Sequence, residues 1–239
     1  DTWVTLRNDF KTYVFSDIYD YNKVIDNIDL SDFNQLLHTL NEINPDIILN
    51  ACGITIRRGV EKIKSNSILL NSALPHFLNE WVASNNKRLI HFSTDCVFSG
   101  KKGNYLDNDV KDASDLYGSS KSMGEILDSK FAITLRGSMI GRELENKTEL
   151  LEWFLNQNES TVKGFTNVIY SGITTFRMAN YVHKIIRDFP RMHGIYNVSS
   201  KSITKFDLVN LFNDFFKKDT TIIPESSYTS NKDLDSTKF

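Results

Sequence analysis

Two groups of residues in the middle of the chain have types and spacing that suit proton transfer. The first is the Ser-Thr-Asp sequence at 93–95, which directly follows an apolar run at 89–92. The second is Tyr117 and Lys121, which stand four residues apart, so that in a helix they share one face. A free phenol titrates at about pH 10, and a neighbouring ammonium stabilises its phenolate. Such a pair suits proton exchange near neutral pH, although two exposed helix residues often have the same spacing.

The elements around these residues predict an α/β fold. Short runs typical of strands lie at 2–6, 25–30, 46–51, 89–92 and 131–135. Helical periodicity separates them at 33–43 and 63–83, and a further helix is expected from Tyr117. The run at 46–51 (DIILNA) is interpreted as a strand covered on both faces, as in a parallel sheet. Strands that alternate with helices indicate a doubly wound parallel sheet, in which ligands bind where the strands end.

The second half of the chain has a more mixed pattern. Helices are predicted at 150–155, 175–186 and 204–216, extended segments at 161–170 and 194–198, and a polar loop at 226–238. The helix at 204–216 is expected to bury an apolar side formed by Phe206, Leu208, Val209, Leu211, Phe212 and Phe215.

Composition excludes several classes of function. The 239 residues have a net charge of −2 with both signs interspersed, so electrostatics gives no reason to expect a nucleic-acid or membrane partner. Cys52 and Cys96 cannot form a disulfide scaffold, which indicates a reducing compartment. The five histidines have no metal-ligand spacing, so no metal is predicted. Without a signal peptide or an apolar span, the sequence predicts a cytoplasmic protein.

The order strand, STDCVF, turn and YGSSKSMGE resembles a known family. It is similar to the extended, sugar-nucleotide branch of the short-chain dehydrogenase/reductases, and most closely to the dTDP-4-dehydrorhamnose reductase family, which has STD, VF and YG-SK-GE patterns in this segment. The resemblance implies a Rossmann-like doubly wound sheet with an NAD(P)-binding domain at 1–140. It also implies a smaller substrate-binding lobe at 141–239, partly interleaved with the first domain.

The resemblance implies a role for each residue of the two central groups. Tyr117 would be the general acid that protonates the sugar carbonyl oxygen, and Lys121 would lower its pKa and bind the nicotinamide ribose beside it. Thr94 would hydrogen-bond the same carbonyl oxygen, with Ser93 as the competing candidate for that role. Asp95 would accept hydrogen bonds from the sugar, or alternatively cap a turn.

One residue of this segment departs from the family pattern. Cys96 stands where the resemblance leads us to expect an aromatic residue after the aspartate. The shape of the sugar pocket, and therefore the identity of the substrate, does not follow from the resemblance.

The resemblance also implies residues for the cofactor and for the nucleotide. The adenosine and ribose side of the cofactor would be lined by Asn50, Ala51, Cys52 and Gly53, with Asp29 and Leu30 at the adenine ring. Arg7 would bind a ribose 2′-phosphate and so favour NADPH over NADH. A helix-capping Asp29 and an exposed strand-end Arg7 are the alternatives. Candidates for the diphosphate or base of the substrate are Lys163, Asn167 and Arg177.

A glycine-rich turn is the one expected motif that the sequence does not contain. A Rossmann fold normally begins with a strand, a turn such as GxGxxG and a helix, which together hold the cofactor pyrophosphate. The resemblance aligns residues 2–7 with the second strand of the family. We therefore expect that the printed sequence begins after the first strand and helix.

Together these features lead to one functional hypothesis and two alternatives. The hypothesis is NADPH-dependent reduction of a nucleotide-linked 4-keto-deoxysugar in surface polysaccharide synthesis, and the resemblance is compatible with a homodimer. A sugar-nucleotide epimerase or dehydratase would keep the fold, but a dehydratase usually has further acid/base residues where Asp95 and Cys96 stand. A non-catalytic subunit, like the regulatory subunit of methionine adenosyltransferase, would keep the fold and lose the reaction.

Overall fold

The computed structural model describes residues 1–16, 18–55, 64–145 and 147–239. The chain divides into two compact units, residues 1–46 and residues 47–239, which are described separately below.

The first unit contains a short parallel strand pair and one helix. Strand β1 (Val4–Thr5) pairs with β2 (Val24–Ile25), and 3-10 helices cover Phe10–Ser16 and Tyr21–Lys23. Helix α1 (Phe33–Ile43) begins where the Asp32 carboxylate accepts hydrogen bonds from the backbone N–H groups of Asn34 and Gln35. It ends at Asn44, which has the left-handed conformation common at helix ends.

A four-stranded parallel sheet is the centre of the second unit. Its strand order is β10–β5–β4–β3, formed by Gly194–Asn197, Ala132–Arg136, Arg88–Ser93 and Ile47–Asn50. The register aligns Ser93 with Arg136 and Arg136 with Asn197, so three strands end with polar residues at one edge. The predicted parallel sheet is therefore confirmed, and its polar strand ends mark the edge where a site is expected.

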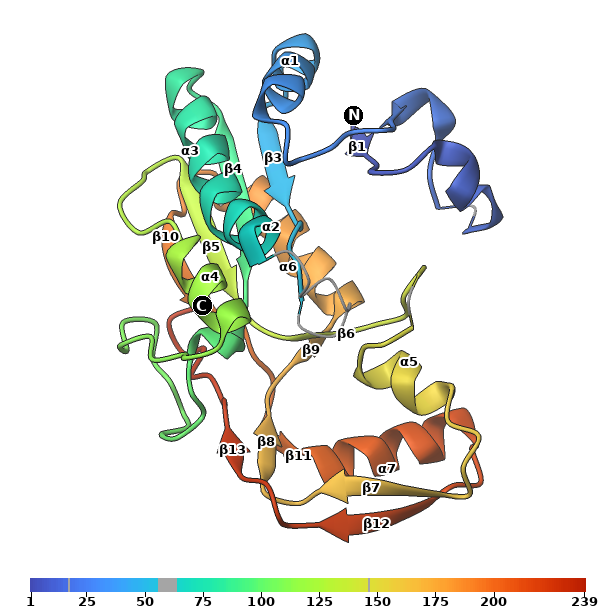
Figure 1. Ribbon diagram of the computed structural model, residues 1–239. Helices are drawn as coiled ribbons and strands as arrows, with labels where there is room; N and C mark the ends of the chain where they lie inside the picture. Colours follow the sequence, from blue (N-terminus) through green and yellow to red (C-terminus); the bar gives the residue numbers. More distant parts are fainter. Residues whose placement is uncertain (17, 56–63, 146) are drawn as a thin grey trace. The chain divides into compact units, whose positions relative to one another are not determined.

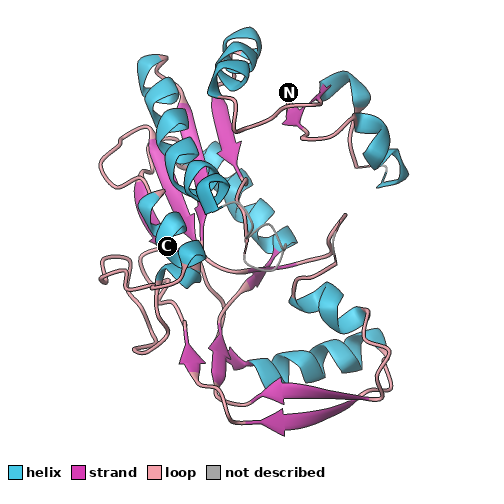
Figure 2. Ribbon diagram, in the orientation of Figure 1, coloured by secondary structure: helices cyan, strands magenta, loops and turns pink. Residues whose placement is uncertain are grey.

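Helices cover both faces of this sheet, as Figures 1 and 2 show. On one side lie α2 (Lys64–Ile68), a π-helical turn (Leu69–Ala73), α3 (Leu74–Ser84) and α4 (Leu116–Met123). On the other side α6 (Thr175–Asp188) buries an apolar stripe against β4 and β5, in a cluster that includes Met178, Val182, Ile185, Ile90, Ile133 and Leu135. Full burial of each such side chain is worth about 1.5–3 kcal/mol.

The remaining elements form a small lobe, shown in the lower part of Figure 1. Strand β7 (Thr161–Phe165) pairs with β12 (Thr221–Glu225), and β8 (Val168–Tyr170) lies between β11 (Ile203–Thr204) and β13 (Ser230–Asn231). Strands β6 (Met139–Ile140) and β9 (Ile173–Thr174) pair between the lobe and the sheet. Helices α5 (Leu150–Leu155) and α7 (Lys205–Phe216) enclose a core with Tyr170.

Two expectations about this region were wrong in detail. Leu208, Val209 and Phe212 of α7 are buried as predicted, but Leu211 is 55% exposed and Phe215 is 79% exposed. A single helix buries only one stripe, and the six apolar positions extend beyond it.

The segment at 226–238 is also not a simple loop. It contains β13, and residues 230–235, here called the C-terminal strap, hydrogen-bond to the segment that follows β4. Leu234 of the strap completes a buried cluster with Val97, Phe98 and Tyr105. Within the described ranges, no helix has the length and apolar character needed to cross a membrane.

Candidate active site

The site begins where strand β4 ends, at residues 94–97, here called the catalytic turn. Thr94 caps the 3-10 helix Asp95–Val97, because its hydroxyl oxygen accepts a hydrogen bond from the Cys96 N–H at 3.1 Å. The same hydroxyl donates to Asp95 Oδ1 at 3.1 Å, and both side chains are buried. The Thr94 hydroxyl and the Asp95 carboxylate are therefore held in fixed positions at the carboxyl edge of the sheet.

Helix α4 brings Tyr117 to the catalytic turn. The Asp115 carboxylate caps the helix by accepting from the Gly118 N–H at 2.9 Å. Gly118 lies so close to the turn that a Cβ atom at this position would overlap the carbonyl oxygen of Cys96. This contact brings the Tyr117 hydroxyl near the side chain of Thr94, which acts on the pKa of the phenol. The structure therefore brings together the two residues predicted to act on one carbonyl oxygen.

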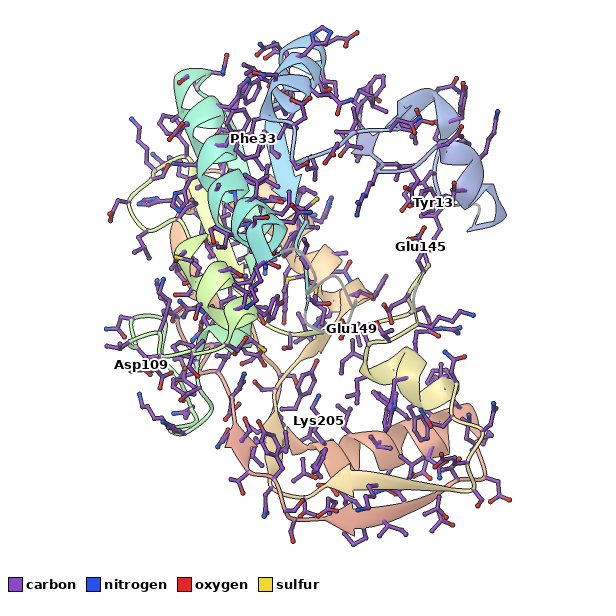
Figure 3. The ribbon with its side chains drawn as sticks, viewed as in Figure 1. Tyr13, Phe33, Asp109, Glu145, Glu149 and Lys205 are labelled. Carbon is purple, nitrogen blue, oxygen red and sulfur yellow. The ribbon has the colours of Figure 1, made fainter. Side chains whose placement is uncertain are left out.

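The surroundings of Tyr117 favour its protonated form. Burial raises the pKa of the phenol, and Cys96, Asp95 and the Glu149 carboxylate raise it further, while the Thr94 hydrogen bond opposes them. Figure 3 labels Glu149 at the start of α5. A raised pKa keeps the proton on the phenol at neutral pH, which is the form that a proton donor needs.

Lys121 lies one turn of α4 after Tyr117 and is almost fully buried. Its ammonium donates to the carbonyl oxygen of Phe92 at 2.7 Å. Burial lowers the pKa of Lys121 to about 8, against opposing effects of Glu125 and Cys52. Burial dominates the pKa of Tyr117 and raises it, so the lowering effect expected of this ammonium stays a prediction.

The segment Asn50–Gly53 begins with the last residue of β3 and lies beside Lys121. A Cβ atom on Gly53 would come within 3.9 Å of the Lys121 ammonium nitrogen and 3.1 Å of Asn71 Oδ1. The Asn50 side chain bonds to the buried His91 ring at 3.1 Å, and its oxygen accepts from the Cys52 N–H. Burial raises the pKa of Cys52, and Lys121 opposes the shift. The predicted cofactor segment and the predicted catalytic lysine are thus neighbours.

Asn71 is a positioning residue that the sequence did not single out. It sits in the π-helical turn, fully buried, and its amide bonds both the N–H and the carbonyl of Ile54, at 2.8 and 3.0 Å. It also donates to the Ser120 hydroxyl of α4 at 3.0 Å. The only sequence signal was an asparagine inside an apolar helical run, SILLNSALP.

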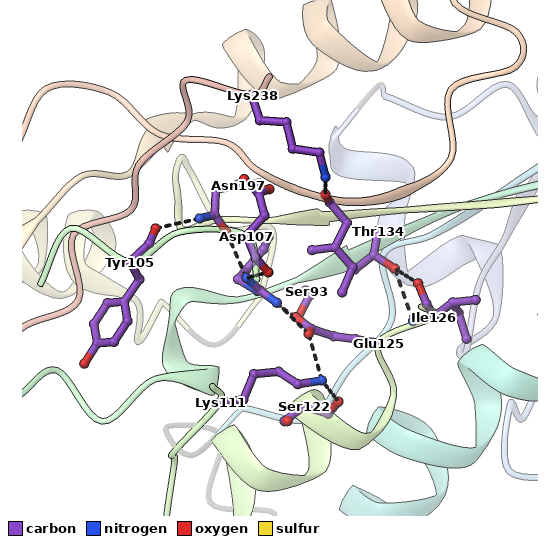
Figure 4. A network of polar contacts seen from close by, with 12 residues as sticks. Ser93, Tyr105, Asp107, Lys111, Ser122, Glu125, Ile126, Thr134, Asn197 and Lys238 are labelled. Atoms are coloured by element: carbon purple, nitrogen blue, oxygen red, sulfur yellow. Dashed lines mark hydrogen bonds and ion pairs between the residues drawn. The ribbon is translucent and has the colours of Figure 1, made fainter. Parts of the chain in front are cut away.

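A buried network of polar contacts around Glu125, drawn in Figure 4, includes Ser93, the residue before the catalytic turn. Glu125 accepts two hydrogen bonds from Arg136, at 2.9 and 2.8 Å, and one from the Ser93 hydroxyl at 2.6 Å. Lys111 pairs with the same carboxylate at 3.1 Å, and Arg136 also donates to Asn197 at 3.0 Å. The network links the ends of β4, β5 and β10. Ser93 is therefore held by Glu125, whereas Thr94 faces Tyr117.

The candidates of the first unit lie close to one another. Asp29 accepts hydrogen bonds from the Ser31 hydroxyl and the Ser31 N–H, at 2.7 and 2.9 Å. These bonds lower the pKa of Asp29 against a small effect of burial, and the charge of Arg7 lowers it further. Leu30 is half-buried, and Asp32, not Asp29, caps helix α1.

The three diphosphate candidates have contacts elsewhere in the lobe and on α6. Lys163 pairs with Glu225 at 2.9 Å, and the Asn167 amide donates to the Ser226 carbonyl at 3.2 Å. The Arg177 guanidinium lies 5.4 Å from the centre of the Tyr181 ring. None of these contacts brings a candidate to the catalytic turn. No group of three potential metal ligands occurs among the residues that the structure describes.

Comparisons with known proteins agree with this geometry. Two curated proteins are each 27% identical to the chain. One is the spore coat polysaccharide biosynthesis protein SpsK of Bacillus subtilis (strain 168), over 181 residues, and the other is dTDP-4-dehydrorhamnose reductase of Aggregatibacter actinomycetemcomitans, over 182 residues. The alignments cover 74% and 73% of the chain but 62% of each relative, so the chain spans less than two thirds of their length.

A solved structure shares the fold. The dTDP-4-dehydrorhamnose reductase of Bacillus anthracis str. Ames, crystallised with NADP, is 18% identical and superposes with a TM-score of 0.78, covering 98% of this chain and 90% of that chain.

The doubly wound sheet, with a threonine at the end of β4 and a Tyr-x-x-x-Lys helix beside it, defines the class of extended short-chain dehydrogenase/reductases. Within that class, the chain belongs to the RmlD substrate binding domain family, which it matches over residues 16–234. The family predicted from the sequence is thereby confirmed.

Proposed function

We propose that this chain is part of an NADPH-dependent reductase that converts the keto group of a nucleotide-linked 4-keto-deoxysugar to an alcohol. The observation that carries the proposal is the contact between Thr94 and Tyr117, with Lys121 one helical turn away, at the carboxyl edge of a parallel sheet. The names of the relatives support a dTDP-linked sugar and a role in making a surface polysaccharide.

Each side chain of the site has its own role in the proposed reduction. When bound, NADPH supplies a hydride to the carbonyl carbon. Tyr117 donates its proton to the carbonyl oxygen, and the raised pKa keeps that proton in place until the oxygen becomes basic. When substrate is bound, Thr94 turns its hydroxyl proton from Asp95 Oδ1 to the same oxygen and stabilises its developing charge. The Asp95 carboxylate then accepts a hydrogen bond from the sugar.

The residues beside Lys121 fit a nicotinamide ribose. Gly53 leaves open the space that a Cβ atom would fill between Asn71 and the Lys121 ammonium, and Asn71 fixes the backbone of this segment. Asn50, Ala51 and Cys52 precede Gly53 in the chain and are proposed to line the adenosine and ribose of the cofactor. Arg7, whose charge acts on Asp29, is proposed to bind the 2′-phosphate that distinguishes NADPH from NADH.

The test is NADPH oxidation by the full-length protein with dTDP-linked 4-keto-6-deoxyhexoses. Replacing Tyr117 by Phe removes the proton donor, and general acid catalysis is typically worth about a hundredfold to ten-thousandfold, so kcat is expected to fall by at least about a hundredfold. The control is Tyr228→Phe, since Tyr228 is 57% exposed in the lobe. Turnover of Tyr117→Phe equal to wild type contradicts the mechanism. Tightly bound NAD with sugar interconversion and no NADPH oxidation indicates an epimerase instead.

A further inference from the structure

Two neighbouring strands of the lobe end side by side with a phenol and an ammonium. Strands β8 and β13 are parallel, and their register pairs Val168 with Ser230 and Ile169 with Asn231. Tyr170 is the last residue of β8, and Lys232 is the first residue after β13. The register therefore places Tyr170 and Lys232 at the same end of this sheet.

The Tyr170 phenol is held in one position. It is 9% exposed, and it folds back over Gly172, where a Cβ atom would overlap the phenol oxygen. Its hydroxyl lies near the side chain of Ser138, which acts on the pKa of the phenol. The ammonium of Lys205, labelled at the start of α7 in Figure 3, lies 4.1 Å from the ring centre. A phenol fixed at both its ring and its hydroxyl can present that hydroxyl to a ligand at low entropic cost.

Lys232 is placed by the C-terminal strap. On either side of it, the Asn231 N–H donates to the Gly100 carbonyl at 2.7 Å, and the Asp233 carbonyl accepts from the Tyr105 N–H at 2.8 Å. Gly100 has a φ of +83°, and a Cβ atom there would lie 3.1 Å from Lys232 Cγ. The half-buried Lys232 side chain lies near Cys96, which raises the pKa of its ammonium.

Both side chains reach the catalytic turn from the lobe. Asp95 and Cys96 act electrostatically on Tyr170 and on Lys232 alike. Burial alone would lower the pKa of Lys232, but Cys96, Asp95 and Asp115 outweigh it, so the ammonium stays charged. The lobe therefore places a hydroxyl and a charged donor near Asp95 and Cys96 of the catalytic turn.

We propose that Tyr170 and Lys232 bind hydroxyl groups of the sugar ring and so determine which sugar the site accepts, an inference that rests on the proposed function. A phenol both donates and accepts, and an ammonium donates up to three hydrogen bonds, which together match the vicinal hydroxyls of a hexose. The Lys163, Asn167 and Arg177 side chains, in contrast, are engaged by Glu225, Ser226 and Tyr181.

The experiment compares two ligands, dTDP and dTDP-glucose, which carries a hydroxyl at C4 and cannot be reduced. Binding to the full-length protein is measured by calorimetry for wild type, Tyr170→Phe and Lys232→Met. The phenylalanine keeps the ring beneath Lys205 and removes only the hydroxyl. The controls are Tyr196→Phe, whose ring has the Lys238 ammonium at 4.2 Å, and Lys201→Met, an exposed residue. Thermal melting confirms that each variant is folded.

Tyr170→Phe should bind dTDP-glucose about three- to tenfold more weakly, and Lys232→Met about tenfold or more, because a charged donor makes the stronger bond. Affinity for dTDP should change less than about twofold, and the controls should match wild type in both cases. Equal losses for both ligands, or no loss for either, overturn the inference and leave the reductase proposal standing. A folded wild-type protein that binds neither ligand contradicts the proposed function itself, and this inference with it.

Discussion

Gly118 fixes the distance between helix α4, which carries the proposed proton donor Tyr117, and the catalytic turn. Its position against the Cys96 carbonyl leaves no room for a methyl group, so Gly118→Ala must push α4 away from the turn. A misplacement of about 1 Å can cost about a hundredfold in rate. We expect kcat to fall by about that factor and stability by about 1–3 kcal/mol, measured by steady-state kinetics and denaturant unfolding. Met123→Ala, at a side chain 54% exposed on the same helix, is the control. A Gly118→Ala enzyme with normal kcat would show that the contact is not needed.

Some residues of the site could be predicted and others could not. The spacing of Tyr117 and Lys121 and the Ser-Thr-Asp sequence were visible in the chain, and the structure brings Thr94 and Tyr117 into contact. Asn71 hydrogen-bonds to the backbone of Ile54, and no pattern of residue spacing predicts such a contact. Tyr170 and Lys232 become neighbours only through the pairing of β8 with β13, two strands too short to have a clear signal.

At the scale of elements, the Glu125 carboxylate holds together the ends of β4, β5 and β10 through its hydrogen-bond network. Glu125 has no exposed side-chain surface and is bonded to Arg136 and Ser93. Burial raises its pKa, but the Arg136 bonds, Ser93 and Lys111 outweigh burial and lower it. Because the folded-state pKa lies below the unfolded value of about 4.3, the pair stabilises the fold above that pH and the stabilisation is lost as the pH falls below it.

We therefore expect Glu125→Gln to lower the free energy of unfolding at pH 7 by about 3–5 kcal/mol, since it leaves Arg136 buried without its counter-ion. The difference from wild type should shrink as the pH drops below about 4, which urea unfolding at several pH values measures. Glu225→Gln breaks the solvent-facing pair with Lys163 and should have a much smaller effect. Equal effects of the two substitutions would contradict the role of burial.

Element types were easier to predict than the faces that they bury. The helices at 150–155 and 204–216 and the strand at 131–135 were recovered within a residue or two. The exposure of Leu211 and Phe215 was not, because six apolar positions in one helix do not show which stripe faces the core. The strap was missed for a related reason, since its polar residues pair through their backbone.

For the whole molecule, the strap joins the lobe to the segment after the catalytic turn, so loosening it should affect both. Gly100→Ala places a Cβ atom against the Ser230 hydroxyl at a φ of +83°. Gly194→Ala is a matched control, because its φ is +86° and nothing lies within 4 Å. Both carry backbone strain of about 1–2 kcal/mol. Only Gly100→Ala should speed amide hydrogen exchange at Tyr105 and Asn231 and weaken sugar-nucleotide binding. Identical exchange in the two variants would contradict the role of the strap.

The fold class could be predicted because strands alternate with helices along the chain. The packing of the C-terminal strap against the segment after β4 could not be predicted in this way. Leu234 meets Val97 and Phe98 from the other end of the sequence. During translation, the sheet and the catalytic turn emerge from the ribosome well before the residues that cover this apolar cluster. A nascent or truncated polypeptide that stops before residue 230 therefore displays Val97 and Phe98 beside its unfinished site, where chaperones and proteases can recognise them. Arrival of the strap covers these residues and, in the same step, places Lys232, which we propose binds the sugar.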